Sequence, residues 1–234
     1  MNEIYKQPIL ILGGFLINYK DYMPMANYLK KRINQPVEIV KTTKLDWLCT
    51  NWEFGWKRIL NKVDIESTKL LEQSATGKIT IIGHSSGGVM LRLFLSNKPE
   101  FGVIYNGKNK ANILITLGSP HNAIRSTVLR KMVNNKYPGS YFKKDVSYVS
   151  IAGNLSIDSK DIKKITKRIA SSSYLSINGN KDSKGDGLVP LESAMLEGSK
   201  KIVINDSAHS KLFGENWYCN IEITKIWWEK LFNL

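Results

Sequence analysis

Short apolar runs of strand length alternate with longer amphipathic stretches along most of this chain. The apolar runs predict strands over 8–12, 36–41, 78–83, 111–117, 147–152, 174–178 and 200–204. The stretches between them predict helices over about 21–32, 57–73, 86–96, 159–170, 191–197 and 221–232. Because strands alternate with helices, we expect a largely parallel central sheet in an α/β protein.

One junction between a predicted strand and a predicted helix carries the pattern Gly-x-Ser-x-Gly, as Gly83-His84-Ser85-Ser86-Gly87. The glycines allow a tight turn and a close approach of strand and helix, so that the serine hydroxyl stands exposed above the sheet. Gly-Ser sequences are also common in ordinary turns, but the apolar segments on both sides favour a nucleophile. Ser85 fits better than Ser86, because a shift of frame would place His84 where the first glycine belongs.

A serine nucleophile needs a base that takes its proton and a carboxylate that orients the base. The chain has three histidines, His84, His121 and His209. Only His209 follows a late predicted strand, which is where the general base is expected in the order Ser, Asp or Glu, His. A surface histidine on a polar loop is the alternative, and the presence of Ser85 favours the base.

Two aspartates are candidates for the orienting carboxylate. Asp186 lies between two glycines in the segment 184–190, after the apolar run 173–177. Asp206 lies three residues before His209, where a carboxylate more often makes a local turn contact. We therefore choose Asp186 and keep Asp206 in reserve, although an Asp-Gly turn is the simpler explanation of Asp186.

An oxyanion that develops on the substrate needs two backbone N–H donors. One is expected from Ser86, the residue after the nucleophile, and the other from the loop after an early strand. The strand 8–12 is followed by Gly13-Gly14, and we assign the second donor to Phe15. Taken alone, Gly13-Gly14 would be an ordinary turn.

Four separated segments together resemble the α/β-hydrolase superfamily, close to its lipase-like and esterase-like branch. These segments are 9–16, 83–88, 117–121, and 185–190 continued through His209. The segment Leu117-Gly118-Ser119-Pro120-His121 resembles the LGTPH stretch of many lipases, and Gly185-Asp186-Gly187-Leu188-Val189-Pro190 resembles their acid loop. The four segments span nearly the whole chain in the order that the superfamily shows.

The resemblance implies a three-layer α/β/α sandwich with a mostly parallel sheet, the α/β-hydrolase fold. It implies Ser85, Asp186 and His209 as the catalytic triad and the N–H groups of Phe15 and Ser86 as oxyanion donors. It offers His121 a role in the wall of the substrate pocket, and Gly14 and His84 are further candidates for that pocket. It requires no metal and no organic cofactor. Many relatives carry His-Gly before the oxyanion residue, where this chain has Gly13-Gly14.

The expected activity is hydrolysis of carboxylic esters, including lipid esters, through an acyl-enzyme. The same triad would serve an acyltransferase or a thioesterase, which differ in the group that accepts or carries the acyl chain. A non-catalytic binding protein on the same fold is the alternative of another class, because a fold does not fix a function. The expected partner is a small-molecule ester or a lipid.

The length of 234 residues predicts one domain over 1–234, with a cap or lid segment expected within 119–170. The aromatic cluster 137–142 in that segment could cover an acyl pocket, but a loop anchored to the core by its rings is favoured. A second aromatic group, Trp47, Trp52, Phe54 and Trp56, could form a binding wall, with core packing as the default.

No apolar run reaches the length of a membrane span, and the N-terminal segment has no secretory signal pattern. Two cysteines do not make a disulfide framework. We therefore expect a soluble intracellular protein, in the cytoplasm or in an organelle stroma.

The net charge of +14 is concentrated in residues 121–170, which hold eleven basic and three acidic side chains. This region could approach an anionic membrane surface, but a solvated basic face is favoured. No motif supports nucleic-acid binding, so no nucleic-acid partner is expected.

Overall fold

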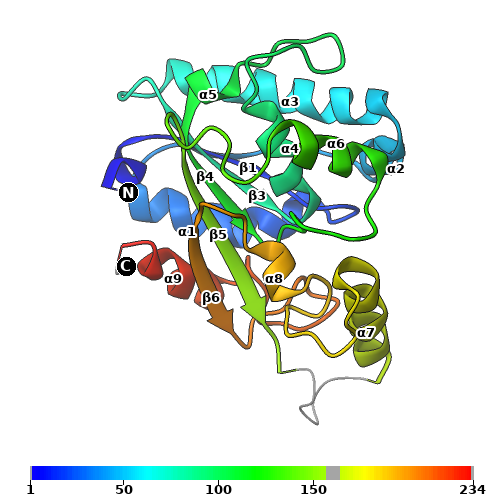
Figure 1. Cartoon of the computed structure of the whole chain (residues 1–234). Coiled ribbons are helices and arrows are strands. Elements are labelled where there is room, and N and C mark those ends of the chain that lie inside the picture. Colours follow the sequence, from blue (N-terminus) through cyan, green and yellow to red (C-terminus); the bar gives the residue numbers. More distant parts are fainter. Residues whose placement is uncertain (1, 157–163, 233–234) are drawn as a thin grey trace.

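The computed structural model describes residues 2–156 and 164–232. Its middle layer is a parallel six-stranded sheet in the order β2-β1-β3-β4-β5-β6 (Figure 1). The strands are β1 (Ile9–Leu12), β2 (Val37–Ile39), β3 (Ile79–His84), β4 (Ala111–Leu117), β5 (Ser147–Asn154) and β6 (Lys200–Asn205). The expected parallel sheet is confirmed, and six of the seven predicted strands are present.

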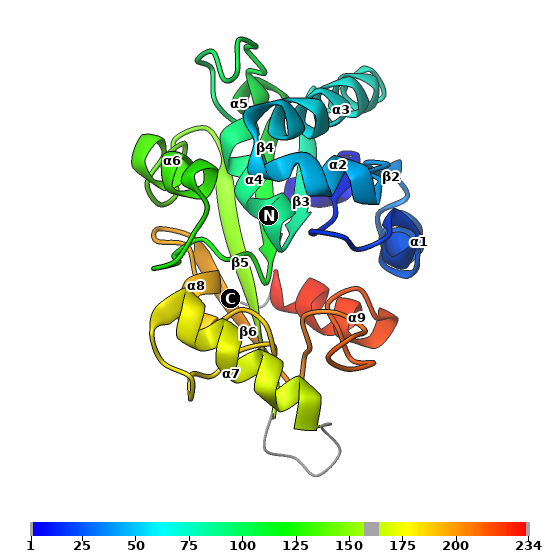
Figure 2. The same ribbon diagram turned by 90° about the vertical axis from the view of Figure 1, so that its right-hand side faces the viewer.

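Helices cover both faces of this sheet. The α-helices are α1 (Met23–Ile33), α2 (Lys44–Leu48), α3 (Glu53–Glu72), α4 (Ser86–Phe94), α5 (Gly107–Lys110), α6 (Val128–Lys136), α7 (Lys164–Asn178), α8 (Leu191–Ala194) and α9 (Ile221–Lys230). Short 3₁₀ helices are η1 (Asn2–Lys6), η2 (Tyr19–Tyr22) and η3 (Cys49–Asn51). Figure 2 shows α3 and α6 in the upper part of the view and α9 in the lower part.

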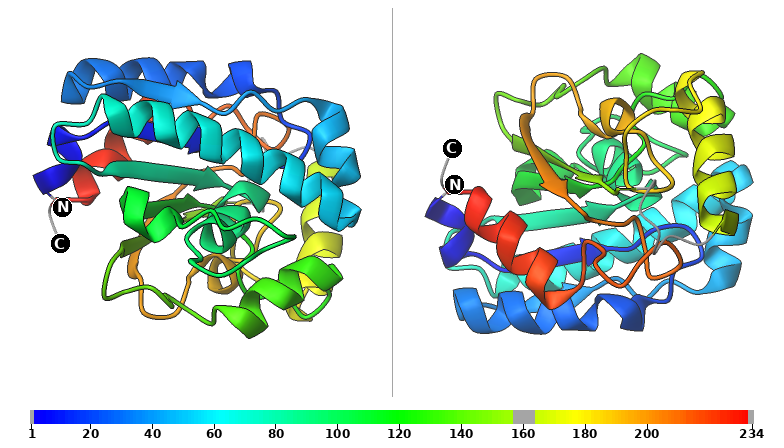
Figure 3. Two further views of the ribbon diagram at one scale, coloured as in Figure 1. Left: turned by 90° about the horizontal axis from the view of Figure 1, so that it is seen from above. Right: turned by 90° about the horizontal axis from the view of Figure 1, so that it is seen from below.

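The two faces of the sheet carry separate hydrophobic cores. Leu10 and Leu12 face the layer of α3 and α4, whereas Ile9 and Ile11 face the layer of α1 and α9, since neighbouring side chains of a strand point to opposite faces. Figure 3 shows α1 and α9 lying side by side across their face of the sheet. The expected three-layer α/β/α sandwich is therefore confirmed.

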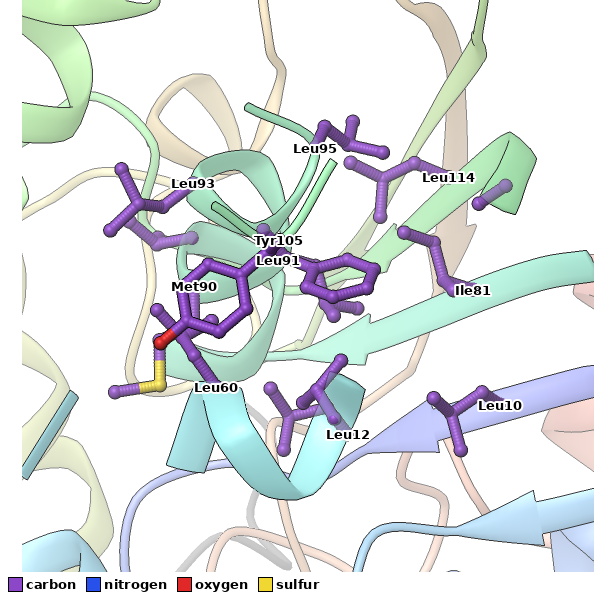
Figure 4. Close-up of a cluster of buried hydrophobic side chains, with 14 of the residues drawn as sticks. Leu10, Leu12, Leu60, Ile81, Met90, Leu91, Leu93, Leu95, Tyr105 and Leu114 are labelled. Atoms are coloured by element: carbon purple, nitrogen blue, oxygen red, sulfur yellow. The ribbon is translucent and has the colours of Figure 1, made fainter. Parts of the chain in front are cut away.

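Helix α4 is buried on every side. All nine of its residues are buried, and its leucines pack with side chains of α3 and of the central strands. Figure 4 shows Leu91 and Leu93 of α4 in this cluster, near Leu60 of α3 and Ile81 of β3. Because α4 follows Ser85 directly, this packing holds in place the helix end next to Ser85.

The strand predicted over 174–178 is wrong, because these residues are the end of α7. The local run is apolar enough for a strand, but Thr166, Ala170 and Tyr174 are the buried residues of the helix. Their spacing of four residues is that of one helix face. The predicted helix start near 159 lies outside the described residues.

Helices α2 and α6 were not predicted, although both begin at a threonine N-cap. The hydroxyl of Thr43 caps α2, and that of Thr127 caps α6 by accepting the backbone N–H of Arg130. The rings of Tyr137 and Phe142, which follow α6, are buried in the core. Two rings of the cluster 137–142 thus anchor the loop to the core, as favoured, whereas the third, Tyr141, is 49% exposed.

The aromatic group near α2 and α3 is divided between core and surface. Trp47 and Trp56 are buried, as expected for core packing, whereas Trp52 and Phe54 are exposed and stack on each other.

Within residues 119–170, where a cap was expected, β5 belongs to the central sheet, and residues 157–163 lie outside the described part. None of the helices described in 2–156 and 164–232 combines the length and apolar character needed to cross a bilayer.

Candidate active site

Ser85 occupies a sharp turn between β3 and α4. Its backbone has φ 53° and ψ −126°, a conformation that non-glycine residues rarely adopt. The turn is fixed by the Ser85 N–H, which donates to the carbonyl of Leu117 at 2.9 Å. A Cβ atom on Gly83 would overlap the backbone of Gly88, so strand and helix approach as closely as the glycines permit.

The structure brings Ser85, His209 and Asp186 into one hydrogen-bonded chain. His209 Nε2 lies 3.0 Å from Ser85 Oγ, and His209 Nδ1 lies 2.8 Å from Asp186 Oδ2. All three side chains are buried, with Ser85 7% exposed and the other two nearly inaccessible. The three residues come from loops at the carboxyl ends of parallel strands, because the elbow follows β3 and the His209 loop follows β6.

Asp186 follows α7 along the chain, whereas the sequence predicted that it follows a strand. Its loop still reaches the carboxyl end of β5, where the Leu155 N–H donates to the Gly185 carbonyl at 2.7 Å. Asp186 Oδ1 accepts the backbone N–H groups of Leu188 and Val189 at 3.0 and 2.7 Å. These bonds leave Oδ2 directed at His209.

The reserve candidate, Asp206, is not part of this chain of hydrogen bonds. Its side chain is exposed, and its Oδ1 accepts the Ser156 hydroxyl at 2.7 Å. Asp206 also has a positive φ of 54°, so it serves a local turn after β6. The preference for Asp186 over Asp206 therefore agrees with the geometry.

Tyr218 is a partner of Asp186 that the sequence did not reveal. Its hydroxyl donates to Asp186 Oδ2 at 2.8 Å and accepts the Gly153 N–H at 2.6 Å. Burial, and then the negative charge of Asp186, raise the pKa of Tyr218 well above its ordinary value. The phenol thus stays protonated and remains a donor to the carboxylate.

Tyr22 and His84 form a second buried network beneath the site. The Gly14 N–H donates to the Tyr22 hydroxyl at 2.7 Å, and Tyr22 Oη lies 2.8 Å from His84 Nδ1. His84 Nε2 lies 3.0 Å from the carbonyl of His209. A carbonyl only accepts, so Nε2 carries the proton and Nδ1 accepts from Tyr22. This network links the loop after β1, the elbow and the loop of His209.

The imidazole of His84 is neutral in this environment. Burial first, and then the nearby charge of His209, lower the pKa of His84 well below its ordinary value. The rings of His84 and His209 have centroids 4.8 Å apart, so two positive charges there would repel strongly. Of these two rings, that of His209 is the one in hydrogen-bond contact with Ser85.

Two backbone N–H groups beside Ser85 have no backbone partner. Within residues 2–156 and 164–232, the N–H groups of Phe15 and Ser86 donate no hydrogen bond to another backbone group. Ser86 is the first residue of α4, where N–H groups have no partner inside the helix and negative charge is favoured. The loop of Phe15 also lies close to Ser85, since a Cβ on Gly14 would lie 2.8 Å from Ser85 Cβ.

A cavity of about 620 Å³ opens beside Ser85 and His209. Most of its lining is apolar, from Phe15, Leu16, Ile17, Ile169, Leu188, Leu212, Phe213 and Trp217. Lys44, Asp21 and Lys211 add charged groups to the lining. The cavity can therefore hold a large apolar group next to the nucleophile.

The expectation that Gly14, His84 and His121 line the pocket is wrong for this cavity. Gly14 and His84 are buried behind the nucleophile in the network of Tyr22. His121 is also buried, with Nε2 3.1 Å from Thr116 Oγ1. The sequence near a motif does not show on which side of the nucleophile turn a neighbouring glycine or histidine packs.

A second, smaller cavity of about 180 Å³ is lined by Phe15, Ser86 and Arg130 among others. Phe15 lines both cavities, whereas Ser85 lines the larger and Ser86 the smaller. Across the described ranges, no three His, Cys, Asp or Glu side chains are grouped as metal ligands would be.

No family model matches the chain, and no curated protein matches its sequence. Solved structures do resemble it. A methylesterase from Arabidopsis has 11% identity and a TM-score of 0.53, with 97% of this chain and 100% of that chain covered. A protein described as a cell surface hydrolase from Lactobacillus plantarum has 13% identity and a TM-score of 0.52, with 98% and 92% covered.

A third structure is described as an alpha/beta superfamily hydrolase from Xanthomonas campestris. It has 11% identity and a TM-score of 0.50, with 95% of this chain and 99% of that chain covered. These likenesses extend over nearly the full length of both chains, and at such identities they concern the fold.

Proposed function

Starting from the α/β-hydrolase fold that the chain shares with these structures, we propose that it is a serine hydrolase of carboxylic esters. The observation that carries the proposal is the hydrogen-bonded chain from Ser85 through His209 to Asp186. A serine, a histidine and a carboxylate in this order form the proton-transfer group of acyl-transfer enzymes. The strained turn of Ser85 supports it, because it holds the hydroxyl in a fixed position.

In this mechanism, Ser85 Oγ attacks the carbonyl carbon of the ester, and His209 Nε2 takes the hydroxyl proton. Asp186 keeps the imidazole oriented with Nε2 toward Ser85, and it stabilises the positive charge of the protonated ring. The N–H groups of Phe15 and Ser86 donate to the oxyanion of the tetrahedral intermediate.

The intermediate collapses when the C–O bond to the alcohol breaks and His209 protonates the leaving oxygen. This step leaves an acyl ester on Ser85. His209 then takes a proton from water, the resulting hydroxide attacks the acyl carbon, and Ser85 Oγ recovers its proton as the carboxylic acid leaves. No residue other than these five is needed for the bond changes.

We expect Ser85→Ala to lower kcat for a 4-nitrophenyl ester by at least about 10³-fold, because it removes the nucleophile. A fluorophosphonate probe should label the unchanged protein on Ser85 and should not label the variant. Circular dichroism checks that the variant is folded, and Ser172→Ala, on the exposed side of α7, is the matched control.

The proposal is contradicted if Ser85→Ala turns over the 4-nitrophenyl ester as fast as the unchanged protein. It is also contradicted if the probe does not label the unchanged protein. The second result would favour a binding protein on the same fold. The acyl-transfer alternatives all pass through the same acyl-enzyme, so they differ only in what carries or accepts the acyl group. Acylation of an added alcohol would indicate an acyltransferase, and preferred cleavage of an added thioester would indicate a thioesterase.

Lipid esters are the narrower substrate class that we propose. The larger cavity is mostly apolar, and three side chains that line it, Phe15, Leu16 and Leu212, are also exposed at the surface. Leu212 is 73% exposed. Exposed apolar groups around an apolar cavity are typical of a surface that receives an apolar ligand.

A further inference from the structure

Arg130 lies beside the nucleophile elbow and has no acidic partner. Its Nη2 donates to Ser86 Oγ at 2.7 Å. In the part of the chain that the structure describes, it forms no ion pair with a carboxylate. Burial alone lowers the pKa of Arg130, and a guanidinium in such a position loses hydration without gaining a counter-charge.

The position of this cation is also unfavourable for the protein alone. Ser86 begins α4, and the amino end of a helix carries partial positive charge. A guanidinium at that end is repelled, whereas an anion between the two would be attracted by both. A purely structural contact to Ser86 does not require a charged side chain.

The guanidinium is nevertheless held in place. Asn134, one turn further along α6, accepts from Arg92 at 2.8 Å and donates to the His121 carbonyl at 2.6 Å. Arg92 also donates to the Tyr137 carbonyl at 2.6 Å, at the end of α6. Arg92 is buried in α4, so α6 is fixed against the elbow helix and Arg130 faces the site from a rigid element.

Arg130 lines the smaller cavity, which shares the lining residue Phe15 with the larger one. An ester carbonyl that sits between Ser85 and the N–H groups of Phe15 and Ser86 therefore has one substituent toward each cavity. Within the described residues, no aspartate or glutamate lines the smaller cavity. Its volume of about 180 Å³ equals roughly six water molecules, enough for a short polar chain.

We propose that Arg130 is a specificity-determining residue that binds a carboxylate of the substrate, so that the preferred ester carries one negative charge a few bonds from the scissile carbonyl. This inference rests on the proposed ester hydrolysis and names its substrate class. The planar guanidinium matches a carboxylate with two parallel hydrogen bonds. One cation and one carboxylate also balance in charge, whereas a doubly charged phosphate would leave a charge uncompensated.

The test compares esters that differ in one carboxylate. For a charge on the acyl side, the pair is mono-4-nitrophenyl adipate and 4-nitrophenyl hexanoate, which have equal chain lengths. For a charge on the alcohol side, the pair is 3-acetoxybenzoate and 3-acetoxybenzamide. The readout is the ratio of kcat/KM within a pair, so that a general effect of a variant on the elbow cancels.

We expect the unchanged protein to prefer the charged member of one pair, and Arg130→Gln to lower that ratio by about 10-fold or more, as for loss of a charged hydrogen bond. Arg130→Lys, which keeps the charge, should restore part of the ratio. Lys131→Gln, an exposed neighbour on α6, removes the same net charge and should leave the ratio unchanged.

The inference is overturned if the unchanged protein does not prefer the charged ester in either pair. It is also overturned if Arg130→Gln keeps the same ratio of kcat/KM as the unchanged protein.

A direct binding measurement separates the two proposals. Calorimetric titration of Ser85→Ala with monomethyl adipate should show binding that is lost in the Ser85→Ala, Arg130→Gln double variant. If no ester is hydrolysed but this binding depends on Arg130, ester hydrolysis is wrong and the anion site stands; if the binding is absent or independent of Arg130, the anion site is wrong.

Discussion

Two tyrosines far from Ser85 in the sequence hold the groups around it. Tyr218 donates to the carboxylate of Asp186, and Tyr22 joins the Gly14 N–H to His84. Neither could be predicted, because the sequence around a tyrosine does not show whether its hydroxyl meets water or a buried partner. Ser85 and Asp186 could be proposed because each lies in a short motif, and His209 because it is the one histidine that follows a late predicted strand.

We predict that Tyr218→Phe lowers the free energy of unfolding by about 1–3 kcal/mol, because it leaves the buried Gly153 N–H without an acceptor. It should also lower kcat, since the Asp186 carboxylate loses one of its donors. Urea unfolding and initial rates check the two effects.

The control for this change is Tyr141→Phe, whose ring is 49% exposed. Its free energy of unfolding should change by less than about 0.5 kcal/mol. The support role of Tyr218 is wrong if the two variants unfold at the same urea concentration.

The order of strands and helices was predictable from the sequence to a large extent, because the buried strands of a parallel sheet are short apolar runs. The prediction failed at α7, where Tyr174-Leu175-Ser176-Ile177 resembles a strand locally but continues a helix face begun at Thr166. It missed α6 because only Leu129 and Val133 are buried in that helix. The pocket lining was also beyond reach, because it is set by side chains from six or more separate segments.

Elements that are joined by neutral histidines should separate in acid. His84 connects β3 to η2 and to the loop after β6, and His121 contacts β4 through Thr116. Burial is the main cause that lowers the pKa of both histidines well below 6.5. Below that pH, the unfolded chain binds protons that the folded chain does not bind.

We therefore predict that the free energy of unfolding falls as the pH decreases from about 6.5 to 5, by up to about 1.4 kcal/mol per pH unit for each histidine. Urea unfolding at a series of pH values measures the slope. His121→Gln should reduce the slope, because it removes one of the two groups. A slope of zero in the unchanged protein would show that these histidines are not kept neutral by the fold.

The apolar cavity and the apolar side chains at its mouth form one apolar surface, mainly across the loops that follow β1, α7 and β6. Each methylene group of a ligand that this surface removes from water stabilises the complex by about 0.8 kcal/mol. The affinity for an ester should then depend on the length of its apolar chain.

We predict that kcat/KM for 4-nitrophenyl esters rises from acetate toward octanoate, by up to about fourfold per methylene until the cavity is filled. Leu212→Ser, at the mouth, should weaken this rise. Leu175→Ser, an exposed leucine of α7 that does not line the cavity, should leave it intact. A flat profile across the series would contradict lipid esters as substrates.

The order in which these parts are synthesised has a consequence for unfinished chains. The strained serine and its helix are complete soon after residue 94, whereas the loop with His209 follows the last strand of the sheet. A nascent or truncated chain that stops before that loop would contain a hydroxyl with nothing to accept its proton. Truncated chains should therefore be inactive in the proposed ester hydrolysis. Activity should appear only after β6 has joined the sheet and brought His209 to Ser85.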